Sequence, residues 1–329
     1  MNGSGRMPEG RDLSLASAEE LLAGYRAGEF TPVDATRAAL AAIETHDAAV
    51  NAMVFTDADN ALAMAAESTR RWQAGEPLGP VDGVPMSIKD ILLTRDWPTL
   101  RGSTLIDEAG PWDADAPSVA RLREAGSVFL GKNTTPEFAW KGVTDSIRHG
   151  ATGNPWGAGL TSGGSSGGAA TAVGLGMGTW SVGTDGGGSV RIPASFTGTV
   201  ALKPTFGRIP LYPPSAYGTL SHAGPMTRSV RDAALMLDVL ARPDARDWAA
   251  LDRASGSYLA GIEDGVEGVR IAYSPALGYG TNDPEVEAAV GAAAQLLAEL
   301  GAHVEQVDPD ITDCVDAFHV LWFTGAAKV

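Results

Sequence analysis

The chain has 329 residues, of which 44% are hydrophobic and 19% are charged, and its formal net charge is -16. This composition is typical of a globular protein that is long enough to bury a large core. An acidic surface repels phosphate backbones and anionic lipid, so we expect neither nucleic acid nor a membrane as a direct partner.

Two further features of the sequence bear on its location, and neither requires an oxidising compartment or a membrane. Cys314 is the only cysteine, which excludes a disulfide within the chain. The N-terminal residues are polar and do not resemble a signal peptide, and no apolar run is long enough to span a bilayer. We therefore expect a soluble, cytoplasmic protein.

The first third of the chain is predicted to be helical. Ser17 followed by Glu20 forms a capping box at the start of one helix, and Thr31 followed by Pro32 is typical of the start of a second. A third helix is predicted over residues 58–73.

After residue 79 the predicted elements alternate between strands and helices. Strand-like runs cover residues 84–92, 127–130, 180–182, 200–202 and 269–273. Helical patterns cover residues 118–125, 166–175, 229–240, 284–300 and 315–327. Such alternation predicts an α/β fold whose sheet is covered by helices on both faces. Residues 244–268 are predicted to form a long loop.

The densest chemical signal is the run TSGGSSGG at residues 161–168. Gly/Ser composition is typical of a flexible linker. Here an apolar, alanine-rich helical pattern follows directly, and a linker would not lead into an element of the core. Small residues before a helix allow close backbone packing and present serine hydroxyl groups, so we interpret the run as part of a site.

A second glycine-rich motif, GTDGGGSVR, occupies residues 183–191 after a predicted strand. A tight turn would explain one or two of its glycines. Three glycines next to Ser189 favour a functional site over a simple turn, because exposed backbone N–H groups beside a serine are what an oxyanion hole requires.

The third motif, GVPMSIKD, ends on Lys89 and Asp90 and contains an apolar strand. The chain has only five lysines, so each one is of interest. If the strand is buried, desolvation lowers the pKa of Lys89 and makes its neutral amine available as a base. The alternative is an ion pair between Lys89 and Asp90 at the surface.

Two other patterns match known motifs only in part. GGSSG at 163–167 fits the nucleophile elbow of α/β-hydrolases, but that fold needs a later histidine, and neither His303 nor His319 has a distinctive setting. Residues 126–132 resemble a phosphate-binding loop, but Asn133 stands where serine or threonine must bind the metal ion. We predict a strand and a turn there. No histidine or cysteine cluster has the spacing of a metal site.

Together, the motifs at residues 83–90, 163–168 and 183–189 resemble the amidase signature family in residue type, order and spacing. The resemblance continues through RIP at 191–193, LKPT at 202–205 and GPMT at 224–227, and it covers about residues 13–240. It implies a single α/β domain with a central mixed sheet covered by helices, the amidase signature fold.

The resemblance also implies a catalytic triad. Ser189 is the expected nucleophile, Lys89 the base, and Ser165 the relay between them, with a cis peptide bond expected before Ser165. The backbone N–H groups expected to hold the oxyanion are those of Gly186, Gly187, Gly188 and Ser189. The residues expected to support the site without reacting are Thr184, Asp185, Arg191 and Ser166, with Asp185 and Arg191 forming a pair. Neither a metal ion nor an organic cofactor is needed.

The implied function is an amidase that hydrolyses a carboxamide, an anilide or a related ester through an acyl-enzyme on Ser189. The alternatives are the catalytic A subunit of a glutamine-dependent tRNA amidotransferase and an inactive amidase fragment. The expected partner is a small-molecule amide, and a homodimer is left open. We expect a flexible segment over 1–12 and a catalytic domain over 13–329 that is cut short at its C-terminus.

Overall fold

The computed structural model describes residues 12–309 and 314–329. Its contacts divide the chain into two compact units, Met1–Tyr258 and Leu259–Val329. Apart from Asp12, the segment that we expect to be flexible lies outside the described residues. All residues of the predicted site belong to the first unit.

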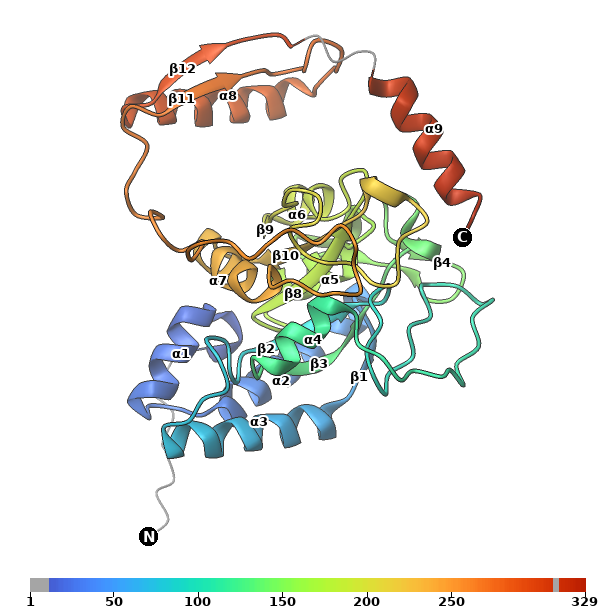
Figure 1. Ribbon diagram of the computed structural model, residues 1–329, viewed down its shortest axis with the longest axis vertical. Helices are drawn as coiled ribbons and strands as arrows, with labels where there is room; N and C mark the ends of the chain where they lie inside the picture. Colours follow the sequence, from blue (N-terminus) through green and yellow to red (C-terminus); the bar gives the residue numbers. More distant parts are fainter. Residues whose placement is uncertain (1–11, 310–313) are drawn as a thin grey trace. The chain divides into compact units, whose positions relative to one another are not determined.

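A six-stranded mixed sheet forms the centre of the first unit (Figure 1). Its spatial order is β1 (Met53–Thr56), β3 (Val128–Asn133), β2 (Pro85–Lys89), β8 (Trp180–Asp185), β10 (His222–Thr227) and β9 (Val200–Ala201). The three strands β3, β2 and β8 run parallel to one another, and the outer strands are antiparallel to their neighbours. The predicted fold class, an α/β fold with a central mixed sheet, is confirmed.

Helices cover both faces of this sheet. On one face, Met86 and Trp180 pack in a core cluster with α1 (Ala18–Ala27), α4 (Pro117–Glu124) and α7 (Val230–Leu240). On the other, Val128 and Leu130 pack with α2 (Pro32–Val50), α3 (Ala58–Ala74) and α5 (Gly167–Gly174). Successive side chains of a strand point to opposite faces. The polar residues of β2 that alternate with Met86 therefore lie on the face that α5 covers.

The N-terminal helices begin where their capping residues predict. Ser17 accepts a hydrogen bond from the backbone of Glu20, and the Glu20 side chain accepts one from the backbone of Ser17. Thr31 and Asp34 make the same reciprocal pair at α2. These caps satisfy N–H groups that have no partner within the helix.

The structure also contains strands that the sequence patterns do not predict. β1 has only four residues, and β10 contains Pro225, which normally argues against an inner strand. β2 ends at Lys89, and residues 90–92 form a turn rather than the end of a longer strand. The remaining short elements of the first unit are η1 (Leu13–Leu15), η2 (Glu137–Ala139), η3 (Gly218–Leu220), β4 (Asp145–Ser146), β5 (Gly150–Ala151), β6 (Gly153–Asn154), β7 (Gly157–Thr161) and α6 (Arg191–Thr197).

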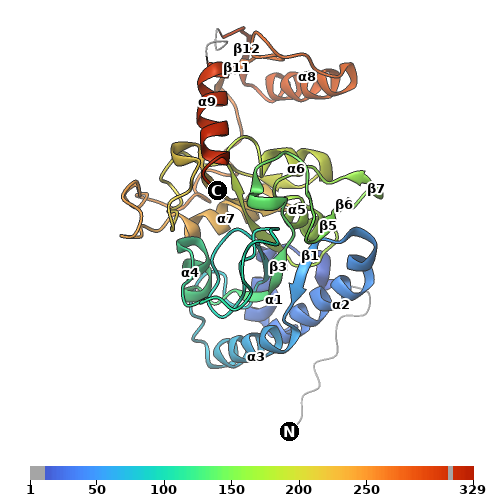
Figure 2. The ribbon, with the colours of Figure 1, turned by 90° about the vertical axis from the view of Figure 1, so that its right-hand side faces the viewer.

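The second unit is built around a parallel strand pair. β11 (Arg270–Tyr273) pairs with β12 (His303–Gln306), and α8 (Pro284–Glu299) connects them and lies beside them (Figure 2). A further helix, α9, covers Cys314–Ala326. Among the described residues, no helix is both long enough and apolar enough to cross a membrane.

Candidate active site

The alternation of β2 directs Lys89 away from the core of α1, α4 and α7 and toward the start of α5. The side chain is 0% exposed. Its Nζ donates hydrogen bonds to three hydroxyl oxygens, those of Ser165 at 2.7 Å, Ser166 at 2.8 Å and Thr184 at 2.9 Å. All three predicted motifs therefore meet at one buried amine.

The surroundings of Lys89 favour its neutral form. Burial lowers its pKa to about 7, although the negative charge of Asp185 acts in the opposite direction. Among the described residues, the amine hydrogen-bonds only to hydroxyl groups, and a hydroxyl stabilises an ammonium ion less than a carboxylate does. Near neutral pH about half of such amines are free to accept a proton.

The small residues at 161–168 form a tightly packed segment, which excludes the linker interpretation. A Cβ added to Gly164 would lie 2.5 Å from the carbonyl carbon of Val143. Thr144 Oγ1 donates to the carbonyl of Gly163 and accepts from the N–H of Gly167. The peptide bond between Gly164 and Ser165 is cis, as expected. These contacts fix the segment that presents Ser165 to Lys89.

The second motif forms the turn between β8 and α6. Both oxygens of Asp185 receive hydrogen bonds from the Arg191 guanidinium, each at 2.9 Å, so the expected pair is present. The N–H groups of Gly188 and Val190 also donate to this carboxylate, at 2.8 and 3.2 Å. Burial alone would raise the pKa of Asp185, but these donors lower it below its ordinary value. Asp185 is therefore a fixed anion that shapes the turn.

Ser189 lies in this turn and meets the first motif through the backbone. The N–H of Ser166 donates to the carbonyl of Ser189 at 3.1 Å, and Ser189 is 5% exposed. Within residues 12–309 and 314–329 its hydroxyl has no hydrogen-bond partner, so it is not bonded to Ser165. The N–H of Gly188 is already used by Asp185, whereas in the same ranges the N–H groups of Gly186 and Gly187 make no such bond.

The surface ion pair considered for Lys89 and Asp90 does not exist. Both residues are fully buried, and Asp90 lies against another lysine, Lys132 of β3, at 3.3 Å. The sequence patterns give Lys132 no role, since they predict only a strand and a turn in its region. The scarcity of lysine is the one signal that draws attention to it.

The nucleophile-elbow alternative also lacks support at Ser165. Across the described part of the chain, no histidine is hydrogen-bonded to Ser165, which instead receives a hydrogen bond from Lys89. Nor do those residues contain a group of three or more histidine, cysteine, aspartate or glutamate side chains that could hold a metal ion. The chemistry available at this site is that of hydroxyl groups and an amine.

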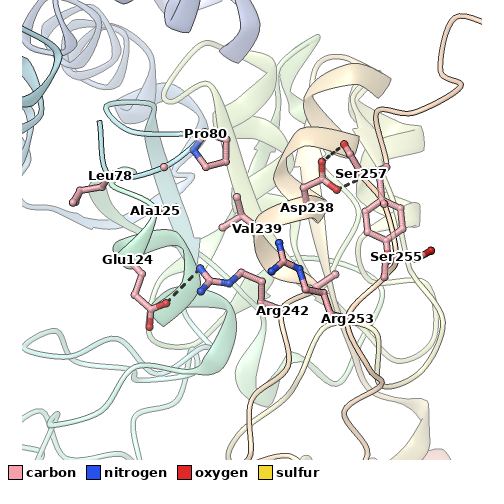
Figure 3. Close-up of a pocket in the computed structure, with 15 residues that line it drawn as sticks. Leu78, Pro80, Glu124, Ala125, Asp238, Val239, Arg242, Arg253, Ser255 and Ser257 are labelled. Carbon is pink, nitrogen blue, oxygen red and sulfur yellow. Dashed lines mark hydrogen bonds and ion pairs between the residues drawn. The ribbon is translucent and has the colours of Figure 1, made fainter. Parts of the chain in front are cut away.

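A separate cavity of about 590 Å³ lies elsewhere in the first unit (Figure 3). The turn before β2, the ends of α4 and α7 and the loop 253–258 line it. Its acidic groups already have partners, because Glu124 lies 3.6 Å from Arg242 and Asp238 accepts the N–H of Tyr258. None of the predicted site residues lines this cavity, so it is not the candidate active site.

Comparison with known proteins places the chain in a family. The family model "Amidase" matches residues 34–329. The chain is 41% identical over 322 residues to an acylamidase of Rhodococcus erythropolis, covering 97% of this chain and 67% of that protein. It is 42% identical over 289 residues to the A subunit of the glutamyl-tRNA(Gln) amidotransferase of Myxococcus xanthus strain DK1622, covering 88% of this chain and 59% of that protein. The chain belongs to the amidase signature family.

Solved structures agree with this membership. A bacterial aryl acylamidase of the amidase signature family superimposes with a TM-score of 0.87 at 34% identity, covering 94% of this chain and 65% of that one. A 6-aminohexanoate cyclic dimer hydrolase gives a TM-score of 0.80 at 34% identity, covering 90% and 61%. The chain thus spans 59–67% of the length of these relatives.

Proposed function

We propose that the protein hydrolyses the C–N bond of a carboxamide or anilide, or a related ester, through an acyl-enzyme on Ser189. The observation that carries the proposal is the buried Lys89 amine, which reaches Ser165 at 2.7 Å. The acylamidase and aryl acylamidase relatives support an amide as the substrate.

The proposed reaction begins with proton transfer. Neutral Lys89 accepts a proton through the hydroxyl of Ser165 as Ser189 attacks the substrate carbonyl. The backbone N–H groups of Gly186, Gly187 and Ser189 hold the oxyanion, whereas that of Gly188 is used by Asp185. The proton returns through Ser165 to the leaving amine. Water then hydrolyses the acyl-enzyme by the same relay, and the serine is restored.

The direct test is turnover of an aryl amide, with release of the aromatic amine as the signal. Wild-type protein should hydrolyse the anilide, and Ser189→Ala should reduce kcat by at least about 10⁴-fold, because it removes the attacking oxygen. Ser255→Ala is the matched control, since Ser255 lies outside the site. Equal turnover by wild type and Ser189→Ala would refute the assignment of Ser189 as the nucleophile. A wild-type protein that is folded but inactive would favour the alternative that the chain is an inactive amidase fragment.

A second candidate is the A subunit of a glutamine-dependent tRNA amidotransferase. Several of the relatives carry that name at 36–42% identity, including the Myxococcus xanthus protein. The same site would then release ammonia from glutamine within a complex. Glutamine hydrolysis that requires added partner proteins, together with no turnover of anilides, would favour this function over the stand-alone amidase.

A further inference from the structure

A second buried lysine lies on the strand next to that of Lys89. Lys132 and Asp90 are both fully buried, and the Lys132 amine also donates to the carbonyl of Leu92 at 2.9 Å and to the hydroxyl of Thr99 at 2.7 Å. The proposed reaction gives this group no part. A buried ion pair persists only where such hydrogen bonds offset the loss of hydration, so its position calls for an explanation.

Lys132 and Lys89 project from opposite faces of the sheet. An irregularity in the pairing of β2 with β3 places Lys132 opposite Ile88 and leaves Lys89 opposite Asn133. Ile88 belongs to the core that contacts α1, α4 and α7, whereas the Lys89 amine meets the serines at the start of α5. Lys132 therefore cannot act on the same atoms as Lys89, and the contacts that connect the two residues run through the backbone.

The backbone connection is the turn 89–92. The carbonyl of its first residue accepts the N–H groups of the third and the fourth, at 2.8 and 3.1 Å. The N–H of Asp90 donates to the carbonyl of Asn133 at 3.0 Å, and the amine of Lys132 holds the carbonyl of Leu92. The pair thus includes the residue after Lys89, and it is bonded to the last residue of the turn.

We propose that Lys132 and Asp90 are positioning residues whose ion pair fixes the turn 89–92 and so holds the Lys89 amine against Ser165. The role assigned to Lys89 rests on the proposed function. Without the pair, the turn relaxes and water reaches Lys89, which lengthens its contact with Ser165 and restores part of its hydration. The other charged groups that act on these side chains are Asp185, His149, Arg101 and Asp115.

The test uses the full chain with lysine labelled by ¹³C at Cε, since only five lysines contribute signals. The Lys89 resonance is titrated by NMR, and the rate of Ser189 labelling by a fluorophosphonate is measured in the same samples. In Lys132→Met, the Lys89 midpoint should rise from about 7 by about one pH unit or more. The labelling rate should fall roughly 10- to 100-fold. Lys141→Met is the matched control, because Lys141 makes a partly exposed ion pair with Asp145.

An unchanged Lys89 midpoint in folded Lys132→Met would overturn the proposal, whether or not the labelling rate falls. If that variant does not fold, Thr99→Val removes one of the three bonds to Lys132 and should shift the midpoint upward by a smaller amount; no shift would likewise overturn it. The midpoint is read without catalysis. Absence of any adduct on wild-type Ser189 would therefore count against the proposed function and leave the positioning role to be judged by the titration.

Discussion

The region around Lys89 and the region around Lys132 use the same residue type in opposite ways. Both amines are fully buried on adjacent parallel strands. In the part of the chain that the structure describes, Lys89 hydrogen-bonds to three hydroxyl groups and to no carboxylate. Lys132 contacts the carboxylate of Asp90 as well as a carbonyl and a hydroxyl. The direct partners, rather than the depth of burial, distinguish the two regions.

This difference decides which lysine can serve as a base. Burial lowers the pKa of Lys132 to about 8, and the charge of Asp90 opposes that effect. Burial lowers the pKa of Lys89 to about 7, and its charged neighbour Asp185 is itself held by Arg191. An amine among hydroxyl groups can give and take a proton near neutrality, whereas an amine paired with a buried carboxylate is better suited to a fixed charge.

The largest expected effect on activity comes from removing the Lys89 amine. Lys89→Met keeps most of the side-chain volume and should reduce kcat/KM for an anilide on the order of 10³- to 10⁴-fold, because proton transfer from Ser165 is lost. Lys141→Met, a substitution of the same kind at a partly exposed position, should leave kcat/KM within about twofold. Steady-state kinetics on folded variants measures both, and equal losses would show that the effect is not specific to the Lys89 amine.

The pH dependence gives the next largest effect. The folded-state pKa of Lys89 is lowered to about 7, and in the proposed reaction the neutral amine is the active form. The value of kcat/KM should therefore rise about tenfold per pH unit below 7 and level off above it. If kcat/KM instead levelled off near pH 8, and if its rise with pH were lost in Lys132→Met rather than in Lys89→Met, Lys132 would be the base in place of Lys89.

A smaller effect is expected from crowding the hydroxyl groups around Lys89. A Cβ at Gly183 would lie 2.9 Å from Ser166 Oγ and 2.8 Å from the sulfur of Met226. Gly183→Ala should lower the free energy of unfolding by about 1–3 kcal/mol and reduce activity, because Ser166 must move away from Lys89. Gly159→Ala meets no neighbour within 4 Å and serves as the control in chemical denaturation. A fully active Gly183→Ala would show that the position of Ser166 is unimportant.

Much of this architecture could be predicted from the sequence, because it depends on residues that are close together in the chain. The capping residues Ser17 and Thr31 act within one helical turn, so the helix starts follow from the sequence. The buried strand before Lys89 and the packed small residues before α5 are likewise visible as an apolar run and a run without bulky side chains. They bring Lys89 and Ser165 into one region of the molecule.

The features that escaped prediction depend on pairing between distant segments. The partner of Asp90 is set by the irregular register of β2 and β3, in which Gly131 lets β3 approach β1: a Cβ there would lie 2.1 Å from the carbonyl oxygen of Phe55. Similarly, β10 tolerates Pro225 inside the sheet, against its local preference. One missed feature is local instead: the use of the Gly188 N–H by Asp185 depends on the backbone conformation of a single turn, which the residue types alone do not determine.

The most direct test of the account is the site of covalent modification by a fluorophosphonate, located by mass spectrometry on wild type, Ser189→Ala and Lys89→Met. The account predicts a single adduct on Ser189 that forms faster as the pH rises through about 7 and is lost in both variants. An adduct on Ser165 that persists in Ser189→Ala would contradict the account, because Ser165 would then be the nucleophile rather than the relay.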